Sequence, residues 1–257
     1  MSRIDHSRAI AHAFVSARNE ARALPVYPGE RPGTLADAYR IQDEALRLHG
    51  GRVAGWKVGR INPPRDGLDR LAGPIFADSV TDAADPVMPV FRGGFAAAEA
   101  EFLLRIGTAP EAGRTRFTNE DARAMVDAVH VGIEIASSPY PGINADGPAV
   151  TIADFGNNNG LVIGAAVADW ATVDLDQWPV ALLVNGEEIG RATTATMLDG
   201  PFGAVRFLAE NLAARGLALE PGQWVSTGAV TGVHEVAPGD RVEALFGERH
   251  RVLCRIG

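Results

Sequence analysis

The sequence has a single cysteine, Cys254, among 257 residues, which excludes an intrachain disulfide and a cysteine-rich metal cluster. Long apolar runs are also missing, because the most apolar stretch, residues 160–168, is far too short to cross a bilayer. At the N-terminus no apolar segment follows a basic start, so a signal peptide is not expected. These absences predict a cytoplasmic protein without a membrane span.

Basic residues are in the minority, with 24 Lys and Arg against 32 Asp and Glu and a net charge of −8. A nucleic-acid partner needs a concentrated basic face. The nearest approach to one, Arg60, Arg65 and Arg70, is interleaved with acidic residues, so nucleic acid is not an expected partner. The phosphate-loop, dinucleotide-binding and Ser-His-Asp patterns are missing too, which argues against nucleotide binding and covalent serine catalysis.

What remains is the composition of a protein with a packed core, with 46% hydrophobic and 22% charged residues. Residues 1–50 are expected to be helical. Their second helix, 34–49, begins with Thr34 and Asp37 in a pattern like a capping box and ends at Gly50-Gly51. We predict one catalytic domain over residues 1–257 of the α+β class. It consists of the helical segment 1–50 and a β-rich body, 51–257, of mixed and mostly antiparallel sheets.

The body shows the alternation and turn signals of strands. Asn185-Gly186 is typical of the type I′ turn of a hairpin. Residues 60–74, rich in Pro and Gly, are expected to form a loop. The remaining expected elements are strands at 53–58, 97–106, 131–136, 224–230, 241–246 and 251–256, and helices at 4–23, 118–129 and 202–215.

Three glutamates carry the chemistry. Glu99 and Glu101 stand two apart in an alternating strand, so their carboxylates project from one face about 6–7 Å apart. Such a pair repels unless a cation lies between its members. Glu134 stands in another apolar strand, and three carboxylates without sulfur or imidazole suit Mg²⁺ or Mn²⁺. The alternative is that the pair is the solvated face of an edge strand, the commonest source of this alternation.

Several stretches occur in an order that resembles the 2-keto-4-pentenoate hydratase group of the fumarylacetoacetate hydrolase superfamily, over nearly the whole chain. They are Gly55-Trp-Lys-Val-Gly59, Gly73-Pro-Ile-Phe-Ala-Asp78, Glu99-Ala-Glu101, the apolar run ending at Glu134, Ile152-Ala-Asp154 followed by Gly164, Asn185-Gly186, the helix beginning at Pro201, Gly222, and Gly239-Asp240.

The resemblance implies the superfamily's β-rich fold, a Mg²⁺- or Mn²⁺-dependent site and a homo-oligomer. It implies that Glu99, Glu101 and Glu134 are the metal ligands. It also implies that Lys57 and Asp78 lie beside the substrate as catalytic residues, although Asp78 could instead be a turn or cap residue. A buried lysine near a metal is expected to have a lowered pKa, and it would stabilise negative charge or transfer a proton.

The reaction implied is addition of water to a 2-hydroxy-2,4-dienoate, which gives a 4-hydroxy-2-oxo acid. A 2-oxo acid can chelate a metal through its carboxylate and keto oxygens, which stabilises the enolate. Decarboxylation of a 2-oxo-dicarboxylate and hydrolytic C–C cleavage of an acylpyruvate use the same chemistry, so they remain alternatives. A non-catalytic partner subunit that keeps the fold is a further alternative.

The chain departs from the group's pattern on the substrate side. It has Asp154-Phe-Gly-Asn157-Asn-Asn159 where relatives commonly show Asp-Asn-Gly-Ser, and Asp199-Gly200-Pro201 where they often show a small residue before His-Pro. Asp154 and Asn157 are predicted to bind substrate, although the asparagines could equally be turn residues. Both departures bear on substrate identity more than on fold or metal.

Five further residues are candidates for the site. Ser226, Thr227 and Gly228 follow a predicted strand and are predicted to hydrogen-bond the substrate carboxylate. His130 is expected to cap or pack at the C-terminus of the helix at 118–129, with an acid–base role as the alternative. His234 is expected in a loop, where lining the pocket and lying apart from it are equally open.

Overall fold

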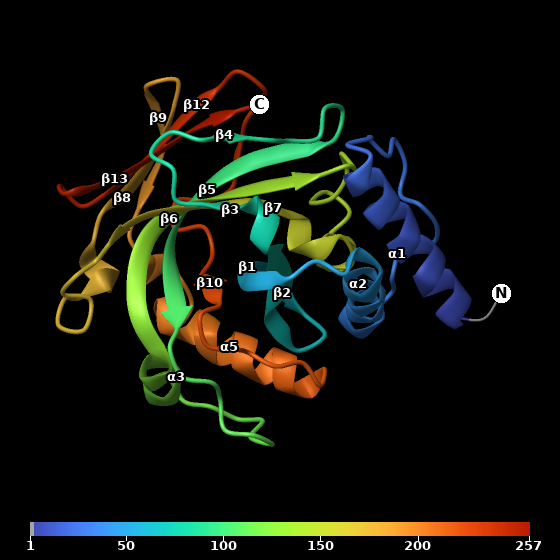
Figure 1. The fold of residues 1–257 in the computed structure, drawn as a ribbon, viewed down its shortest axis with the longest axis horizontal. Helices are drawn as coiled ribbons and strands as arrows, with labels where there is room; N and C mark the ends of the chain where they lie inside the picture. Colours follow the sequence, from blue (N-terminus) through green and yellow to red (C-terminus); the bar gives the residue numbers. More distant parts are fainter. Residues whose placement is uncertain (1–2) are drawn as a thin grey trace.

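The computed structural model describes residues 3–257, so the first two residues of the predicted domain lie outside it, and it contains two β-sheets (Figure 1). The larger sheet has the order β2-β1-β10-β5-β6-β7-β3, with β11 paired to β5, and the smaller has the order β4-β13-β12-β8-β9. Among the described strands, parallel pairing is confined to β1/β10, β3/β7 and β13/β4. The prediction of mixed, mostly antiparallel sheets is therefore confirmed.

The strands are β1 Val53–Arg65, β2 Leu68–Phe76, β3 Val80–Thr81, β4 Val87–Met88, β5 Phe95–Ile106, β6 Val126–Ser138, β7 Asn158–Ala166, β8 Val180–Val184, β9 Glu187–Ala192, β10 Trp224–Ser226, β11 His234–Glu235, β12 Arg241–Phe246 and β13 His250–Ile256. The helices are α1 Arg3–Asn19, α2 Leu35–His49, α3 Asn119–Met125, α4 Pro148–Ala153 and α5 Gly200–Ala214, with short 3-10 helices η1 Ala77–Ser79, η2 Phe155–Asn157, η3 Leu175–Gln177 and η4 Thr194–Thr196. None of the helices within residues 3–257 has the length and apolarity to cross a lipid bilayer.

Helices α1 and α2 lie together at one end of the molecule, away from the smaller sheet (Figure 1). The Thr34 hydroxyl accepts the backbone N–H of Asp37 at the start of α2, and Gly50 ends the helix in a left-handed conformation, as the sequence predicts. Apolar residues of α1 pack with Tyr140 and Phe155 of the body in one buried cluster. This contact brings the last turn of α1 against the segment that follows α4.

The predicted loop at 60–74 is wrong, because β1 and β2 form a hairpin that covers this stretch. The two strands pair up to Arg60 opposite Arg70, and the register shifts before Arg65 pairs with Leu68. Pro63 and Pro64 fall inside this irregularity, where no ladder N–H is needed, whereas Pro74 lies opposite Trp56 in the paired part of β2. Pro and Gly therefore mark a bulge and a turn within a hairpin here.

The predicted helix at 118–129 is too long. Helix α3 ends at Met125, and β6 begins at Val126, so His130 lies in a strand and not at a helix end. The β-branched residues Val126 and Val129 suit a strand, and pairing with β5 outweighs the helical pattern of the preceding turns.

Strand β5 lies between β10 and β6 in the middle of the larger sheet. The face that carries Ala98, Ala100 and Phe102 belongs to the largest apolar core. The opposite face is buried as well, because nearly every residue of the strand is shielded from solvent. The solvated edge-strand alternative for the glutamate pair is therefore wrong.

Candidate metal and substrate site

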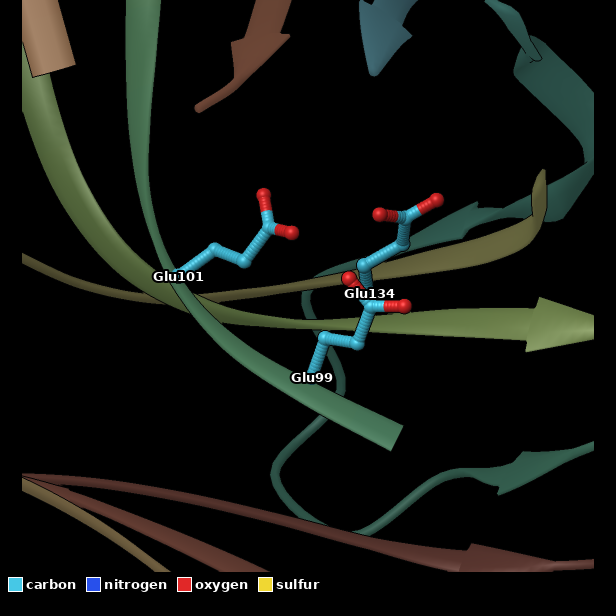
Figure 2. A group of neighbouring side chains, drawn as sticks. All are labelled: Glu99, Glu101 and Glu134. Carbon is cyan, nitrogen blue, oxygen red and sulfur yellow. The ribbon is translucent and has the colours of Figure 1, made fainter. Parts of the chain in front are cut away.

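Three glutamates meet on the inner face of the larger sheet. Glu99 and Glu101 project from β5, and Glu134 of β6 lies directly opposite Glu99 in the antiparallel register. Their side chains extend to the same side of the two strands (Figure 2). The relative exposures are 4% for Glu99 and 0% for both Glu101 and Glu134, so water does not solvate these acids as it does at a surface.

The carboxylates are spaced as ligands of one ion. One oxygen from each residue lies within 4.8 Å of the others. The second oxygen of Glu101 accepts the Ser226 hydroxyl at 2.5 Å and the Gly228 N–H at 2.9 Å. An oxygen of Glu134 accepts the Asn158 side-chain amide at 2.9 Å. Each of these two glutamates is thus fixed through one oxygen.

The remaining oxygens indicate what the group can hold. Oε1 of Glu101 is buried and has no hydrogen-bond donor among the described residues, and the buried Oε2 of Glu134 has the Lys57 ammonium as its charged neighbour at 3.2 Å. Buried acceptors without partners are costly unless a cation satisfies them. Three carboxylate oxygens and no nitrogen or sulfur donor suit a hard divalent ion. The donor set therefore fits a divalent cation.

The charges point the same way. Burial, followed by the charges of Glu134 and Glu99, raises the pKa of Glu101 well above its usual value. Burial raises the pKa of Glu99 to about 7, although the charge of Lys57 opposes the shift. One lysine does not neutralise three buried carboxylates, whereas a divalent cation between them would.

Lys57, the only lysine in the sequence, extends from β1 into this group. Its Nζ lies 3.2 Å from Oε2 of Glu134 and donates to Oδ1 of Asn157 at 3.3 Å. Burial alone lowers the pKa of Lys57, but the surrounding glutamates outweigh burial and raise it. This direction is opposite to the lowering expected from the sequence, because that lowering depends on the positive charge of a bound cation.

A cavity of about 990 Å³ opens above the glutamates, and Lys57, Glu99 and Asn157 form part of its wall. The cavity is within the size range of small-molecule sites. The wall also includes Thr227 and Gly228, but their polar groups already have partners: the Thr227 hydroxyl donates to the Phe102 carbonyl at 2.8 Å, and the Gly228 N–H donates to Glu101. These two residues shape the site, and Gly228 also holds Glu101.

Asp78 and Asp154 lie away from the metal group. Asp78 is exposed and lines a second cavity, of about 490 Å³, together with His49 and Arg18. Asp154 is fully buried and forms an ion pair of 2.6 Å with Arg18. Neither residue lines the cavity above the glutamates, so the structure does not bring them together with Lys57.

The histidines are not in the cavity wall either. His130 bonds to the Gly164 carbonyl at 2.8 Å from within β6. His234 lies in β11, which pairs with β5, and its Nε2 lies 3.0 Å from the Thr231 carbonyl oxygen. Asp199, in the position where relatives often have a small residue, accepts hydrogen bonds from Arg70 and Arg206.

Two residues that contribute to the site are not predicted from the sequence. Asn158 was recognised only as one of three asparagines, yet its amide is the hydrogen-bond donor to Glu134. Arg18 was not recognised at all. Its partner Asp154 is 136 positions away, and a helical arginine gives no local sign of such a contact.

Comparison with known proteins shows which sequences this chain resembles. The family model described as fumarylacetoacetate (FAA) hydrolase C-terminal matches residues 56–252. A 4-oxalocrotonate decarboxylase of Pseudomonas sp. (strain CF600) is 27% identical over 98% of this chain and 96% of its own length. A 2-hydroxyhexa-2,4-dienoate hydratase of Comamonas testosteroni is 27% identical over 90% of this chain and 89% of its own.

The fold agrees with a solved structure. The 4-oxalocrotonate decarboxylase of Pseudomonas putida G7, complexed with magnesium and adipate, superposes with a TM-score of 0.83 at 22% identity, covering 100% of this chain and 99% of that one. At this identity the likeness is evidence for the fold alone. The predicted β-rich body with a helical N-terminal segment is thereby confirmed.

Proposed function

This chain belongs to the fumarylacetoacetate hydrolase family, and from that premise we propose that it is a divalent-metal-dependent hydratase. It adds water to a 2-hydroxy-2,4-dienoate of the 2-oxopent-4-enoate type and gives a 4-hydroxy-2-oxo acid. The observation that carries the proposal is the buried group of Glu99, Glu101 and Glu134, of which Glu99 lines a cavity together with Lys57.

In this proposal the three glutamates hold Mg²⁺ or Mn²⁺. When bound, the ion supplies a Lewis acid for the carboxylate and 2-oxygen of the substrate. Ser226 and the Gly228 N–H hold one oxygen of Glu101, and Asn158 holds one of Glu134, so the second oxygen of each glutamate is left for the ion, with Lys57 beside that of Glu134. Preorganised ligands of this kind need no reorganisation when the ion binds.

Lys57 has two tasks. Its ammonium supplies positive charge at the cavity floor, where negative charge develops on the 2-oxygen as the dienol becomes a 2-oxo-3-enoate. Its Nζ also carries protons that can be exchanged with the reacting carbon chain. Asn157 accepts one hydrogen bond from Nζ and so fixes its direction. The apolar wall of the cavity, which includes Ile61, Leu71 and Val230, limits the access of water to the substrate's tail.

The experiment is turnover of 2-hydroxypenta-2,4-dienoate, followed by loss of its ultraviolet absorbance, with chelator-treated protein as control. Loss of absorbance only with Mg²⁺ or Mn²⁺, together with a 4-hydroxy-2-oxo product, is the expected result. Turnover by the purified chain alone also excludes a non-catalytic partner subunit. Equal turnover in the presence of a chelator would contradict the proposal.

A second function, decarboxylation of a 2-oxo-dicarboxylate, is favoured by the positive charge in the cavity wall. Arg60 is exposed there and has no carboxylate partner among the described residues, and Arg65 contributes a second guanidinium. A carboxylate at the far end of the substrate would meet these arginines. Two of the relatives with the strongest matches are named 4-oxalocrotonate decarboxylase. Release of CO₂ from a 2-oxohexenedioate, with no turnover of the pentadienoate, would favour this function over hydration.

The proposal includes a homo-oligomer that acts in the cytoplasm. Light scattering of the purified chain tests the oligomer, and a mass equal to 27.1 kDa would contradict it.

A further inference from the structure

We propose that Arg18 of α1 is a positioning residue for the metal and substrate site, although it contacts neither the glutamates nor the cavity above them. The inference rests on the proposed function, because it takes Glu134 as a metal ligand. Arg18 acts through residues 154–159, here called the asparagine loop, which comprises the connection after α4 and the first two residues of β7.

All three nitrogens of the Arg18 guanidinium donate hydrogen bonds. Its Nε donates to one Asp154 carboxylate oxygen at 2.6 Å, and a terminal nitrogen donates to the other oxygen at 2.9 Å. Further bonds run to the carbonyls of Asn158 at 3.0 Å and Ser137 at 3.2 Å. Asp154, 0% exposed, also accepts the Ser138 hydroxyl at 2.7 Å. A bidentate, buried pair with this many partners fixes the loop in one position.

The backbone held by this pair is strained. Phe155, Gly156 and Asn157 have φ values of 55°, 64° and 59°, so three consecutive residues adopt the left-handed conformation and two of them are not glycine. Residues persist in such conformations only where the surroundings over-determine them. Arg18 binds Asp154 before the strained run and the Asn158 carbonyl after it, so it fastens both ends.

The asparagine loop delivers two side chains to the site, one from the end of the strained run and one from the residue after it. Asn157 accepts a hydrogen bond from Lys57 Nζ at 3.3 Å and donates to Asn144 at 3.0 Å. Asn158 donates to Glu134 at 2.9 Å. Release of the loop would therefore free the proposed catalytic lysine and one proposed metal ligand together.

This role gives the N-terminal helices a function in the site. The family model covers residues 56–252, and α1 lies outside that range. The segment therefore contributes more than apolar contacts, because one of its charged side chains orders the wall of the cavity.

The test must separate positioning from stability. Arg18→Met alone leaves a buried Asp154 without its cation and can unfold the protein. The double variant Arg18→Met/Asp154→Asn removes both charges, and Arg18→Lys restores a cation without the bidentate geometry. Arg8→Met, on the same helix and 71% exposed at the side chain, is the matched control.

Three measurements are made on the wild type and on each variant: the thermal midpoint without metal, the Mn²⁺ affinity by calorimetry, and, except for Arg18→Lys with its second lysine, the Hε–Cε cross-peak of ¹³C-lysine-labelled, chelated protein. Because Lys57 is the only lysine, this cross-peak reports on the site alone. We expect the double variant to keep a midpoint near that of the wild type, to bind Mn²⁺ about 10–100-fold more weakly and to show a shifted Lys57 cross-peak. The Mn²⁺ affinity of Arg18→Lys should lie between those of the double variant and the wild type. Arg8→Met should match the wild type.

A double variant with wild-type Mn²⁺ affinity and an unmoved Lys57 cross-peak would overturn the inference. A site defect that follows the thermal midpoint across all variants would also overturn it, because Arg18 would then be merely structural. Failure of the wild type to bind Mn²⁺ would instead contradict the proposed function, and the Lys57 cross-peak would still test the link from Arg18 to the site.

Discussion

Glu101 has one carboxylate oxygen in two hydrogen bonds and the other without a donor, in a part of the protein that excludes water. Burial and the neighbouring Glu134 raise its pKa well above the ordinary value, so ionised Glu101 is unfavourable unless a cation is present. At the scale of single residues, this environment is what distinguishes a proposed ligand from a surface carboxylate.

The variant Glu101→Gln should lose Mn²⁺ affinity by about 100-fold or more, because it removes a charged ligand. Without metal its thermal midpoint should equal or exceed that of the wild type, because one of three repelling charges is gone. Calorimetry and thermal unfolding with and without Mn²⁺ measure both effects. The control is Glu188→Gln, an exposed residue in β9, which should change neither. Unchanged Mn²⁺ affinity in Glu101→Gln would refute the site assignment.

Substitution of Lys57 should affect turnover without weakening metal binding. We expect Lys57→Met to lower kcat by about 10²–10⁴-fold, since it removes the charge and exchangeable protons beside the substrate. Mn²⁺ affinity should be kept or increased, because a positive charge next to Glu134 is lost. Steady-state kinetics and calorimetry on the same preparation give the two values. A large loss of Mn²⁺ affinity with an unchanged kcat would be the opposite of what this role requires.

The sequence leads to the glutamates and Lys57 because strand alternation and the ordered motifs place each of them locally. It does not lead to the environments of Asp78 and Asp154, which depend on contacts distant in sequence. Asp154 is a polar residue in a predicted loop, which suggests substrate binding, but its carboxylate forms an ion pair with Arg18 of α1. Thr227 and Gly228 line the cavity, but their donor groups already bond to Phe102 and Glu101, and the predicted hydrogen bonds to a substrate carboxylate stay a prediction.

At the scale of elements, the site depends on close contact between β2 and the asparagine loop. A Cβ atom on Gly73 of β2 would overlap the Phe155 carbonyl, and a Cβ on Gly156 would lie 3.0 Å from Lys57 Cδ. Both contacts involve the strained run that carries Asn157. Glycine at these positions allows the hairpin and the loop to approach each other.

The variant Gly73→Ala should therefore destabilise the protein by about 1–3 kcal/mol, because backbone must move to admit the new methyl group. The thermal midpoint should fall by about 2–12 °C. Gly33→Ala is the control, because nothing lies within 4 Å of its Cβ position. Thermal unfolding compares the two. Equal midpoints for Gly73→Ala and the wild type would show that the loop and hairpin tolerate separation.

Element boundaries were predicted where one signal dominates. The Asn185-Gly186 turn has φ values of 54° and 86°, as a type I′ turn requires, and the Thr34 cap begins α2. The prediction failed where two signals compete. The prolines of β1 suggest a loop, and the stretch after Met125 continues a helical pattern, yet pairing with a neighbouring strand decides both.

At the scale of the whole molecule, the N-terminal helices are docked on the body partly through His49. The His49 ring, at the end of α2, stacks on Phe76 at 3.7 Å between centroids and meets Phe155 edge-on. Burial, with a smaller contribution from Arg18, lowers the pKa of His49, although Asp78 opposes the shift.

This shift predicts a pH dependence of stability. The unfolded chain has the higher His49 pKa, near 6.5, so it binds more protons than the folded protein below neutrality. The free energy of unfolding should therefore decrease as the pH falls from about 7 through the folded pKa, below which this contribution is fully lost. Urea unfolding between about pH 8 and pH 5 measures it. His49→Gln should flatten the dependence, whereas His12→Gln, an exposed residue of α1, should not. Identical slopes for both variants would exclude His49 as the source.

The measurement that tests the central claim most directly is the anomalous difference map of a crystal grown with Mn²⁺. We predict one strong peak bounded by oxygens of Glu99, Glu101 and Glu134, at about 2–2.5 Å from each. A peak elsewhere, or no peak with the three carboxylates bonded only to protein groups, would contradict the claim that this chain holds a divalent cation on its buried glutamates.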